Sequence, residues 1–345
     1  MGRKNTVNLN MPPHMHPRTQ RSGKVYYYMY HKGEDGKRKE IALGDDFILA
    51  LKKYADLNVI TKPSHGPTFS DVYTRYMVDA LPKLAASSAR IWRMDVKHLM
   101  ASFADAPLSQ IKPVHIRQFL DDHADKPTTA NRCKRVFSVM WNKARGWGYT
   151  ELPNPCEGIQ GHSLDKRTVY ISDAIYKAVW TCGSAPVRDA MDLAYLTGQR
   201  PADALNMTEH DIIDGHLIVT QEKTKQPLRI QIVGELAALL ARIEVRKAAC
   251  KFKTAALLVN TNGKRLTGPA LRTQFHKARD AVIAKSPELE KDVKNFRFYD
   301  LRAKAADDTA DGRGQEAARD LLGHESVRTT QRHYLRRGKI VTPTK

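Results

Sequence analysis

Two segments rich in proline and glycine divide this chain and constrain its fold more than any other feature. TKPSHGPT at 61–68 and ELPNPCEGI at 151–159 both interrupt stretches with helical periodicity. A chain of 345 residues is also too long for one small core. We therefore expect three parts, residues 1–62, residues 66–155 and residues 163–345, the last with a C-terminal tail.

The first part, residues 1–62, reads as a small appendage. Residues 1–23 are polar and are expected to be irregular. The segments Val25–Tyr30 and Lys39–Leu43 predict a hairpin around a glycine-containing turn, and residues 46–60 have helical periodicity. Such a unit is either a structural ornament or a DNA-binding arm. Its mixture of Tyr, Lys and Arg suits contact with a nucleic-acid backbone, so we favour the arm.

The other two parts differ in pattern. In residues 66–155 the periodicity predicts only helices, at 69–82, 87–103, 113–123 and 128–147. Residues 163–345 are mixed: strands are expected at 216–221, 227–233 and 256–260, with helices at 172–182, 184–197, 201–207, 234–249, 268–284, 299–311 and 314–322. The expected fold is mainly α with small β elements.

Charge and cysteine content narrow the class of function. The formal net charge is +20 at pH 7, and the basic residues are spread along the whole chain. Distributed positive charge suits a protein that wraps a polyanion such as DNA, and nothing in the sequence indicates a membrane partner. No apolar run approaches the roughly 18 residues that span a bilayer. The start lacks the apolar stretch of a secretory signal, and the four cysteines lack metal-site spacing, so we expect a cytoplasmic protein without zinc.

Three short segments in the C-terminal half carry residues suited to phosphodiester chemistry. They read TGQRPADAL, YDLR and LLGHESVRTTQRHY, and they supply Arg200, Arg302, His324 and Tyr334 in that order. Two guanidinium groups can hold the non-bridging oxygens of a phosphate and neutralise charge that develops in the transition state. A phenolic oxygen can attack phosphorus and form a covalent intermediate.

The order and wording of these segments resemble the tyrosine recombinase (phage integrase) family, and the resemblance covers residues 66–340. It implies an N-terminal β-hairpin arm, a helical core-binding domain and an α+β catalytic domain. In this family an arginine at the position of Arg200 grips the scissile phosphate, and Asp203 takes the place of the acid that buttresses it. Arg302 matches the second phosphate-binding arginine. A lysine on a hairpin protonates the leaving oxygen; we assign that role to Lys223, with Lys225 as a close competitor.

One position departs from the family pattern. The family motif is His-x-x-Arg, whereas this chain has Tyr299 in place of the histidine. A phenol with a pKa of about 10 is a poor base at neutral pH, but it can still donate or accept a hydrogen bond. The resemblance gives His324 a hydrogen bond to a non-bridging oxygen, and makes Tyr334 the nucleophile.

The resemblance implies a site-specific recombinase that cleaves and rejoins double-stranded DNA at attachment sites through a 3′-phosphotyrosyl link, for integration or excision of a phage or mobile element. It implies a homotetramer on synapsed DNA in the bacterial host cell, with a host DNA-bending protein or an excisionase as candidate accessory partners. No cofactor and no metal ion are expected. Two alternatives stay open: an enzyme like type IB topoisomerases, and a DNA-binding regulator whose site has decayed at Tyr299.

Overall fold

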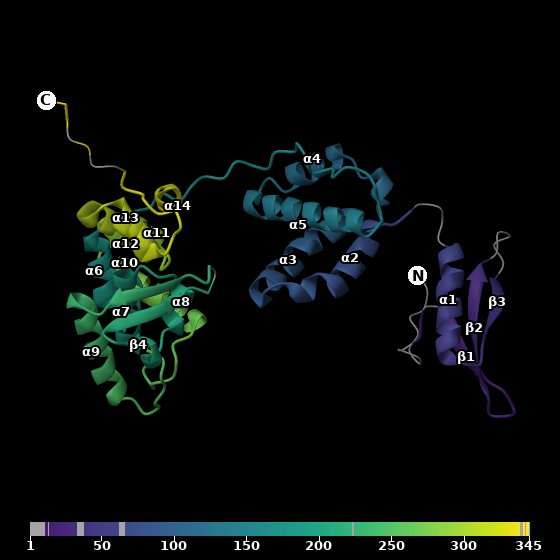
Figure 1. Cartoon of the computed structure of the whole chain (residues 1–345), viewed down its shortest axis with the longest axis horizontal. Helices are drawn as coiled ribbons and strands as arrows, with labels where there is room; N and C mark the ends of the chain where they lie inside the picture. The colour runs from purple at the N-terminus through teal and green to yellow at the C-terminus, as the bar shows by residue number, and fades with distance from the viewer. Residues whose placement is uncertain are drawn as a thin grey trace. The chain divides into compact units, whose positions relative to one another are not determined.

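In the computed structural model the chain divides into two compact units, Met1–Leu164 and Asp165–Lys345 (Figure 1). The structure describes residues 11–12, 14–32, 38–61, 66–222, 224–338, 341 and 343–344. The first unit contains two separate hydrophobic cores, one beneath the N-terminal strands and one among helices. The boundaries expected for the three sequence parts remain a prediction.

A three-stranded antiparallel sheet and one helix form the N-terminal part. The strands pair in the order β1 (Met15–Thr19), β2 (Val25–Lys32) and β3 (Arg38–Gly44), and α1 (Phe47–Thr61) packs on one face through a small core around Met29. The expected strands and helix are confirmed, while the turn between β2 and β3 lies outside the described residues. The expectation of an irregular segment at residues 1–23 was wrong for Met15–Thr19, because β1 forms there by pairing with β2. As an edge strand, β1 tolerates its proline.

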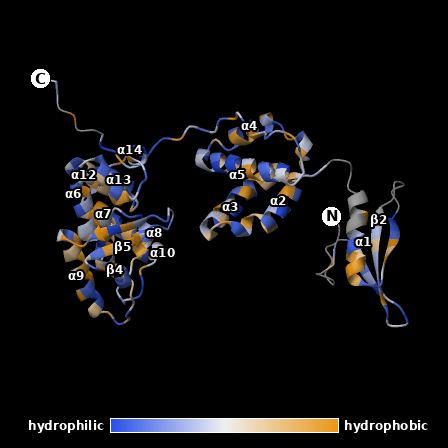
Figure 2. Ribbon diagram, in the orientation of Figure 1, coloured by the Kyte–Doolittle hydropathy of each residue, from blue (hydrophilic) through white to orange (hydrophobic). Residues whose placement is uncertain are grey.

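Four α-helices build the second core of this unit, and all four were expected. They are α2 (Phe69–Asp79), α3 (Ala86–Phe103), α4 (Pro113–Asp122) and α5 (Pro127–Gly146). Figure 2 shows hydrophobic and hydrophilic residues alternating along them, as amphipathic helices require. Large aromatic side chains fill the core, among them Phe137 and Trp141, whose rings stack 5.8 Å apart.

The segment after α5 lies along the helical core. The Asn131 side chain on α5 pairs with the His162 backbone through two 2.8 Å bonds, Nδ2–H to the carbonyl and the peptide N–H to Oδ1. Asn154 is buried and donates to Ser138 Oγ at 2.8 Å. Residues 151–159, which the sequence suggested as a linker, therefore pack against the helices of the first unit.

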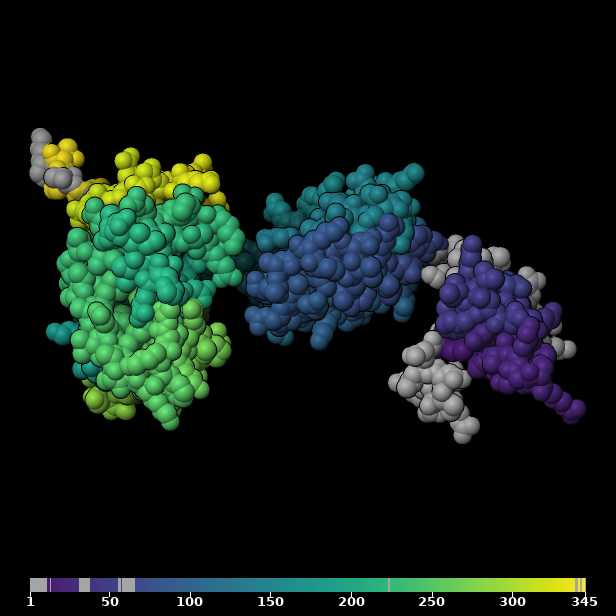
Figure 3. Space-filling model, turned by 60° about the horizontal axis from the view of Figure 1, so that its bottom comes forward, coloured from purple at the N-terminus to yellow at the C-terminus, as the bar shows by residue number. Residues whose placement is uncertain are grey.

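The second unit, whose surface is coloured teal, green and yellow in Figure 3, combines helices with a small sheet. Its strands pair antiparallel in the order β4, β5, β6. The elements are α6 (Asp173–Cys182), α7 (Ala185–Thr197), α8 (Pro201–Asn206), β4 (Ile212–Ile213), β5 (His216–Thr220), β6 (Pro227–Gln231), α9 (Gly234–Ala248), α10 (Gly268–Lys285), α11 (Glu290–Asn295), α12 (Asp300–Arg313), α13 (Gln315–Leu322) and α14 (Val327–His333).

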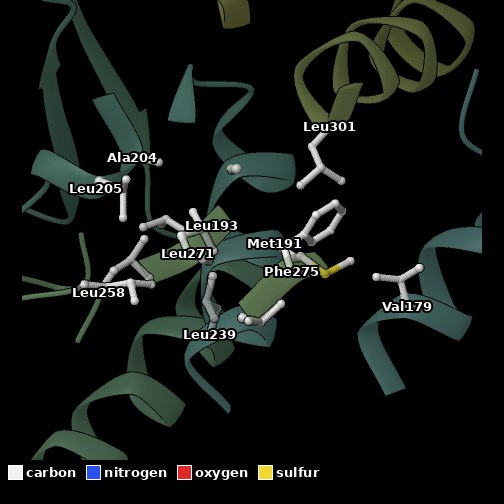
Figure 4. Close-up of a cluster of buried hydrophobic side chains, with 14 of the residues drawn as sticks. Val179, Met191, Leu193, Ala204, Leu205, Leu239, Leu258, Leu271, Phe275 and Leu301 are labelled. Atoms are coloured by element: carbon white, nitrogen blue, oxygen red, sulfur yellow. The ribbon is translucent and has the colours of Figure 1, made fainter. Parts of the chain in front are cut away.

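A buried apolar cluster holds these elements together (Figure 4). Met191 and Leu193 of α7, Phe275 of α10 and Leu301 of α12 meet in it, so α7, which ends just before Arg200, and α12, which carries Arg302, share one core. The seven expected helices and the β5–β6 hairpin are confirmed. The strand expected at 256–260 is wrong: the segment makes only isolated bridges, since its neighbours are loops.

Other expectations concern metals, thiols and membranes. All four cysteines are free. Within the described parts of the chain, no group of three or more His, Cys, Asp or Glu is placed to hold a metal ion. Among the same residues, every helix is too short or too polar to cross a bilayer.

Candidate active site

Arg200 stands where the chain turns from α7 into α8. Gly198 ends α7 with a φ of 64°, and a Cβ there would lie 3.0 Å from Leu321 Cγ, so glycine fits both the turn and the close packing. The Arg200 side chain is 18% exposed, and its Nη1 donates to Gln221 Oε1 at 3.1 Å. Asp203 is buried with an oxygen 3.7 Å from the same Nη1, within the distance of an ion pair.

Arg302 lies on α12, is 1% exposed and is fixed by backbone carbonyls. Its Nη1 donates to Gly198 O at 2.7 Å, and its Nη2 donates to Leu322 O at 2.8 Å. Burial lowers the pKa of Arg302, and the charge of Arg200 acts in the same direction. A guanidinium nevertheless stays protonated in proteins, so two positive charges lie close together around one site.

The hydrogen bonds of His324 define its protonation state. Its Nε2 lies 3.2 Å from Arg302 Nη2, which can only donate, so Nε2 must be the acceptor. The proton therefore sits on Nδ1, which donates to Thr330 Oγ1 at 2.9 Å. Burial and the charges of Arg302 and Arg200 lower the pKa of His324 to about 4, so the imidazole is neutral at neutral pH.

Tyr334 lies in the centre of this group. It caps the C-terminus of α14 and is only 7% exposed, with the Arg302 guanidinium carbon 5.1 Å from its ring centroid and the His324 ring 5.0 Å away. Burial alone would raise the pKa of Tyr334. The hydrogen bond from Tyr299 and the charges of Arg302 and Arg200 outweigh that effect and lower it below the ordinary value.

Tyr299 is the direct partner of Tyr334. Its hydroxyl donates to the Tyr334 oxygen at 3.1 Å, while its side chain remains 43% exposed. Burial of part of its ring raises the pKa of Tyr299 to about 12, and the bond to Tyr334 acts in the same direction. Of the two phenols, Tyr334 therefore ionises first, and Tyr299 stays a donor.

The chain just beyond Tyr334 is tied to its own unit. Arg336 is buried and its Nη1 donates to Asp300 Oδ1 at 2.7 Å and to Val169 O at 2.6 Å. Asp300 is fully buried and also accepts from Arg167 Nε at 2.8 Å. Burial would raise the pKa of Asp300, but the two arginines lower it, so the carboxylate stays charged.

The hairpin expected to carry a general acid is present as β5 and β6. Lys223 lies outside the described residues. Lys225 is exposed, and with a φ of 57° it shapes the turn, its backbone N–H donating to Gln221 O at 2.8 Å.

The structure thus brings together five of the residues expected from sequence: Arg200, Tyr299, Arg302, His324 and Tyr334. Sequence reasoning missed the side chains that hold them, namely Gln199, Gln221, Asp300, Thr330 and Arg336. Each of these stands within five residues of a predicted site residue in the sequence. Polar residues so close to a site motif were the available signal, but burial cannot be read from one sequence.

The fold and this geometry define a class of enzyme. Two guanidinium groups, a neutral imidazole and a tyrosine with a lowered pKa suit phosphoryl transfer to a phenolic oxygen. Comparison with known proteins agrees: residues 170–339 match the phage integrase family. The chain belongs to this family, the tyrosine recombinases, and is therefore an enzyme that cleaves and rejoins DNA strands.

Curated relatives and solved structures extend the match to nearly the whole chain. The integrase of Escherichia phage lambda is 25% identical over 347 residues, covering 94% of each chain. Prophage integrase IntE of Escherichia coli K12 is 24% identical and covers 98% of this chain and 97% of its own. A lambda integrase tetramer bound to a Holliday junction matches 97% of this chain and 99% of its own, with a TM-score of 0.69 and 20% identity. The Tn1549 transposon integrase with transposon right end DNA matches 78% of this chain and 95% of its own, with a TM-score of 0.64 and 15% identity. These structural likenesses establish the fold.

Proposed function

We propose that this protein is a site-specific DNA recombinase that integrates or excises a phage or mobile element, with Tyr334 as its nucleophile. One observation carries the assignment of the nucleophile. Tyr334 is the phenol that accepts a hydrogen bond, lies beside Arg302 and has a lowered pKa, whereas Tyr299 has a raised one. Curated relatives along nearly the whole chain are integrases, which supports the biological role.

The proposed step is a phosphoryl transfer. The Tyr334 oxygen, after losing its proton to water, attacks the scissile phosphorus and forms a P–O bond. The bond from phosphorus to the 5′ oxygen breaks, and that oxygen takes a proton from the Lys223 ammonium group. A 3′-phosphotyrosyl link and a free 5′-hydroxyl result. The phosphodiester energy is kept in the link, so the hydroxyl of a partner strand can reverse the step without ATP or a metal ion.

Each arginine has a distinct part in this step. Arg200 is partly exposed and can reach a non-bridging oxygen, while the buried Arg302 adds a fixed positive charge beside the nucleophile. Preorganised charge of this kind stabilises the phosphorane without reorganisation. Asp203 holds Arg200 in place, and Tyr299 stabilises the Tyr334 phenolate by hydrogen bonding.

His324 supports the site without acting as a base in the free enzyme. Its Nε2 already accepts from Arg302, and its neutral ring lies beside Tyr334, with no described hydrogen bond to the Tyr334 oxygen. When a phosphate oxygen accepts the Nη2 hydrogen that Nε2 accepts in the free enzyme, Nε2 is freed, while Arg302 stays bonded to Gly198 O and Leu322 O. Thr330 can either accept from or donate to Nδ1, so the imidazole can change tautomer and offer an N–H to the phosphate.

The wider assembly follows from the family. We assign attachment-site DNA as the substrate and a homotetramer on two synapsed duplexes as the active form, in the cytoplasm of a bacterial host. A host DNA-bending protein and an excisionase are the accessory partners to test. The sheet of the N-terminal part presents Arg18 over the Tyr28 ring at 4.9 Å, a cationic and aromatic face suited to an arm-type DNA site.

Covalent capture tests this function. The substrate is a nicked duplex carrying DNA that flanks the gene, so that the cleaved fragment diffuses away and the adduct persists. We expect the wild type to form a denaturant-stable complex, with or without EDTA, and Tyr334→Phe to bind the DNA without forming one. Binding without any adduct would instead favour a decayed regulator. Equal relaxation of plasmids lacking the site would favour a topoisomerase.

A further inference from the structure

Gln221 has no assigned role, yet its side-chain amide makes four hydrogen bonds beside the site. It follows β5 directly and is 0% exposed. Its Nε2 donates to Gln199 Oε1 at 2.7 Å and to Leu322 O at 2.9 Å. Its Oε1 accepts from Arg200 Nη1 at 3.1 Å and from Thr224 Oγ1 at 2.8 Å. Both donors and both lone pairs of the amide are therefore used.

The orientation of this amide is determined by its surroundings. Gln199 is also buried, and its Nε2 donates to Thr197 O at 2.9 Å and to Leu321 O at 3.0 Å. Because carbonyl oxygens can only accept, the Oε1 of Gln199 must face Gln221. The Nε2 of Gln221 must face that oxygen in turn, which leaves its Oε1 for Arg200. If the Gln221 amide were flipped, its Oε1 would face the acceptors Gln199 Oε1 and Leu322 O, and its Nε2 would face the donor Arg200 Nη1.

The same residue closes the turn of the hairpin. Its backbone N–H donates to Gln226 O at 3.1 Å, and its carbonyl accepts from Lys225 N at 2.8 Å. The next residue, Glu222, donates its backbone N–H to Asp203 Oδ1 at 2.9 Å. The turn is thus bonded to Gln221 and to α8, the helix that begins beside Arg200.

The glycine of the LLGH segment makes this arrangement possible. Gly323 ends α13 with a φ of 63°, and a Cβ there would lie 3.1 Å from Gln221 Nε2. A larger residue would push the amide away from Leu322 O, which Arg302 Nη2 also uses as its acceptor at 2.8 Å. One carbonyl therefore receives both Gln221 and the second arginine.

We propose that Gln221 is a positioning residue that holds Arg200 and the β5–β6 turn in one fixed arrangement. One residue then fixes the position of Arg200, which binds the phosphate, and the position of the turn, from which the leaving oxygen is protonated. The inference rests on the proposed function. Replacing the amide by an apolar side chain would remove one hydrogen bond each from Arg200 Nη1, Thr224 Oγ1, Gln199 Oε1 and Leu322 O, and each loss at a buried group has a cost.

The two proposed effects of Gln221, on the position of Arg200 and on the position of the turn, can be separated with a leaving group that needs no proton. In a substrate with sulfur in place of the bridging 5′ oxygen, the departing thiol has a pKa of about 8.5 and leaves as an anion without a general acid. Lys223→Ala should be rescued by this sulfur substrate, and Arg200→Ala should not. Gln221→Leu should slow adduct formation on the oxygen substrate by on the order of 10²-fold and on the sulfur substrate by only about 10-fold.

Two further variants keep the test decisive. Gln231→Leu makes the same change at an exposed position of β6 and should match the wild type on both substrates. Thr224→Val removes only the hydroxyl that bonds Gln221, from an exposed residue, so folding is not at risk. Adduct formation by Thr224→Val on the oxygen substrate should be about 5-fold slower than that of the wild type, and the sulfur substrate should restore the rate.

The outcomes are distinguishable. If the wild type forms no adduct on the oxygen substrate, the proposed function fails, whatever Gln221 does. If the wild type reacts and Gln221→Leu behaves like Gln231→Leu, the positioning role is overturned. A defect in Gln221→Leu and Thr224→Val that is equal on both substrates would overturn the link to the turn.

Discussion

Replacing Tyr299 with phenylalanine should make cleavage depend on pH in a specific way. The change removes only the hydroxyl that donates to the Tyr334 oxygen at 3.1 Å. That bond stabilises the phenolate of Tyr334, so its loss raises the pKa of the nucleophile. Because Tyr299 is 43% exposed, water can take the vacated place, and the site should otherwise keep its structure.

The magnitude follows from the kind of bond. The bond from Tyr299 is worth about 1 kcal/mol more to the Tyr334 phenolate than to the neutral phenol, and one pKa unit corresponds to about 1.4 kcal/mol, so the pKa of Tyr334 should rise by roughly 0.7. At a pH below this pKa, the fraction of Tyr334 present as phenolate falls by the same factor as its acid dissociation constant. Cleavage near neutral pH should therefore slow about 5-fold, and the difference from the wild type should vanish at alkaline pH, where both are ionised.

Single-turnover adduct formation on the nicked substrate, measured from about pH 6 to pH 10, tests this. The rate should rise with pH in both proteins, with the rise displaced to higher pH in Tyr299→Phe. No inflection from the His324 imidazole is expected in the neutral range, because its pKa is lowered to about 4. A defect that is the same at every pH, or as large as that of Arg302→Ala, would refute the reasoning and give Tyr299 a different chemical part.

Three further predictions concern other parts of the molecule. Arg200→Ala and Arg302→Ala should each lose cleavage by on the order of 10²-fold with little loss of DNA binding. Only Arg302→Ala, which removes a hydrogen-bond donor from each of two buried carbonyls, should also lower the melting temperature in calorimetry. Thr330→Val should disturb the His324 tautomer, seen in its ¹⁵N shifts, and slow cleavage about 10-fold, with recovery in Thr330→Ser. Deleting residues 1–62 should leave core-site binding intact in mobility-shift assays and abolish binding to a second, distal class of sites.

Sequence anticipated the site because its motifs lie where elements begin or end. Gly198 and Gly323 end helices with positive φ, and the residues that follow them are placed by those turns. The assignment of Arg200, His324 and Tyr334 rests on the resemblance of the motifs around them to those of the tyrosine recombinase family. The mixed helix and hairpin pattern around them was also readable from periodicity.

The contacts that hold the site residues in place could not be predicted from the sequence, for physical reasons. Gln221 is buried beside Gly323, the glycine at the end of α13, which leaves room for its side chain. The two residues are distant in sequence. The contact of Tyr299 with Tyr334 joins residues 35 positions apart, so no local pattern reports it. Strand β1 likewise exists only through pairing with β2, and its composition alone suggested an irregular segment.

The central claim is that Tyr334, and not its neighbour Tyr299, becomes joined to DNA. The two hydroxyl oxygens are 3.1 Å apart, so loss of activity in a single variant cannot by itself decide between them. Tryptic digestion of the trapped wild-type complex, removal of the DNA to a residual nucleotide and tandem mass spectrometry locate the adduct directly. We expect the modified nucleotide on Tyr334 in every complex. A nucleotide on Tyr299, or on any other residue, would contradict it.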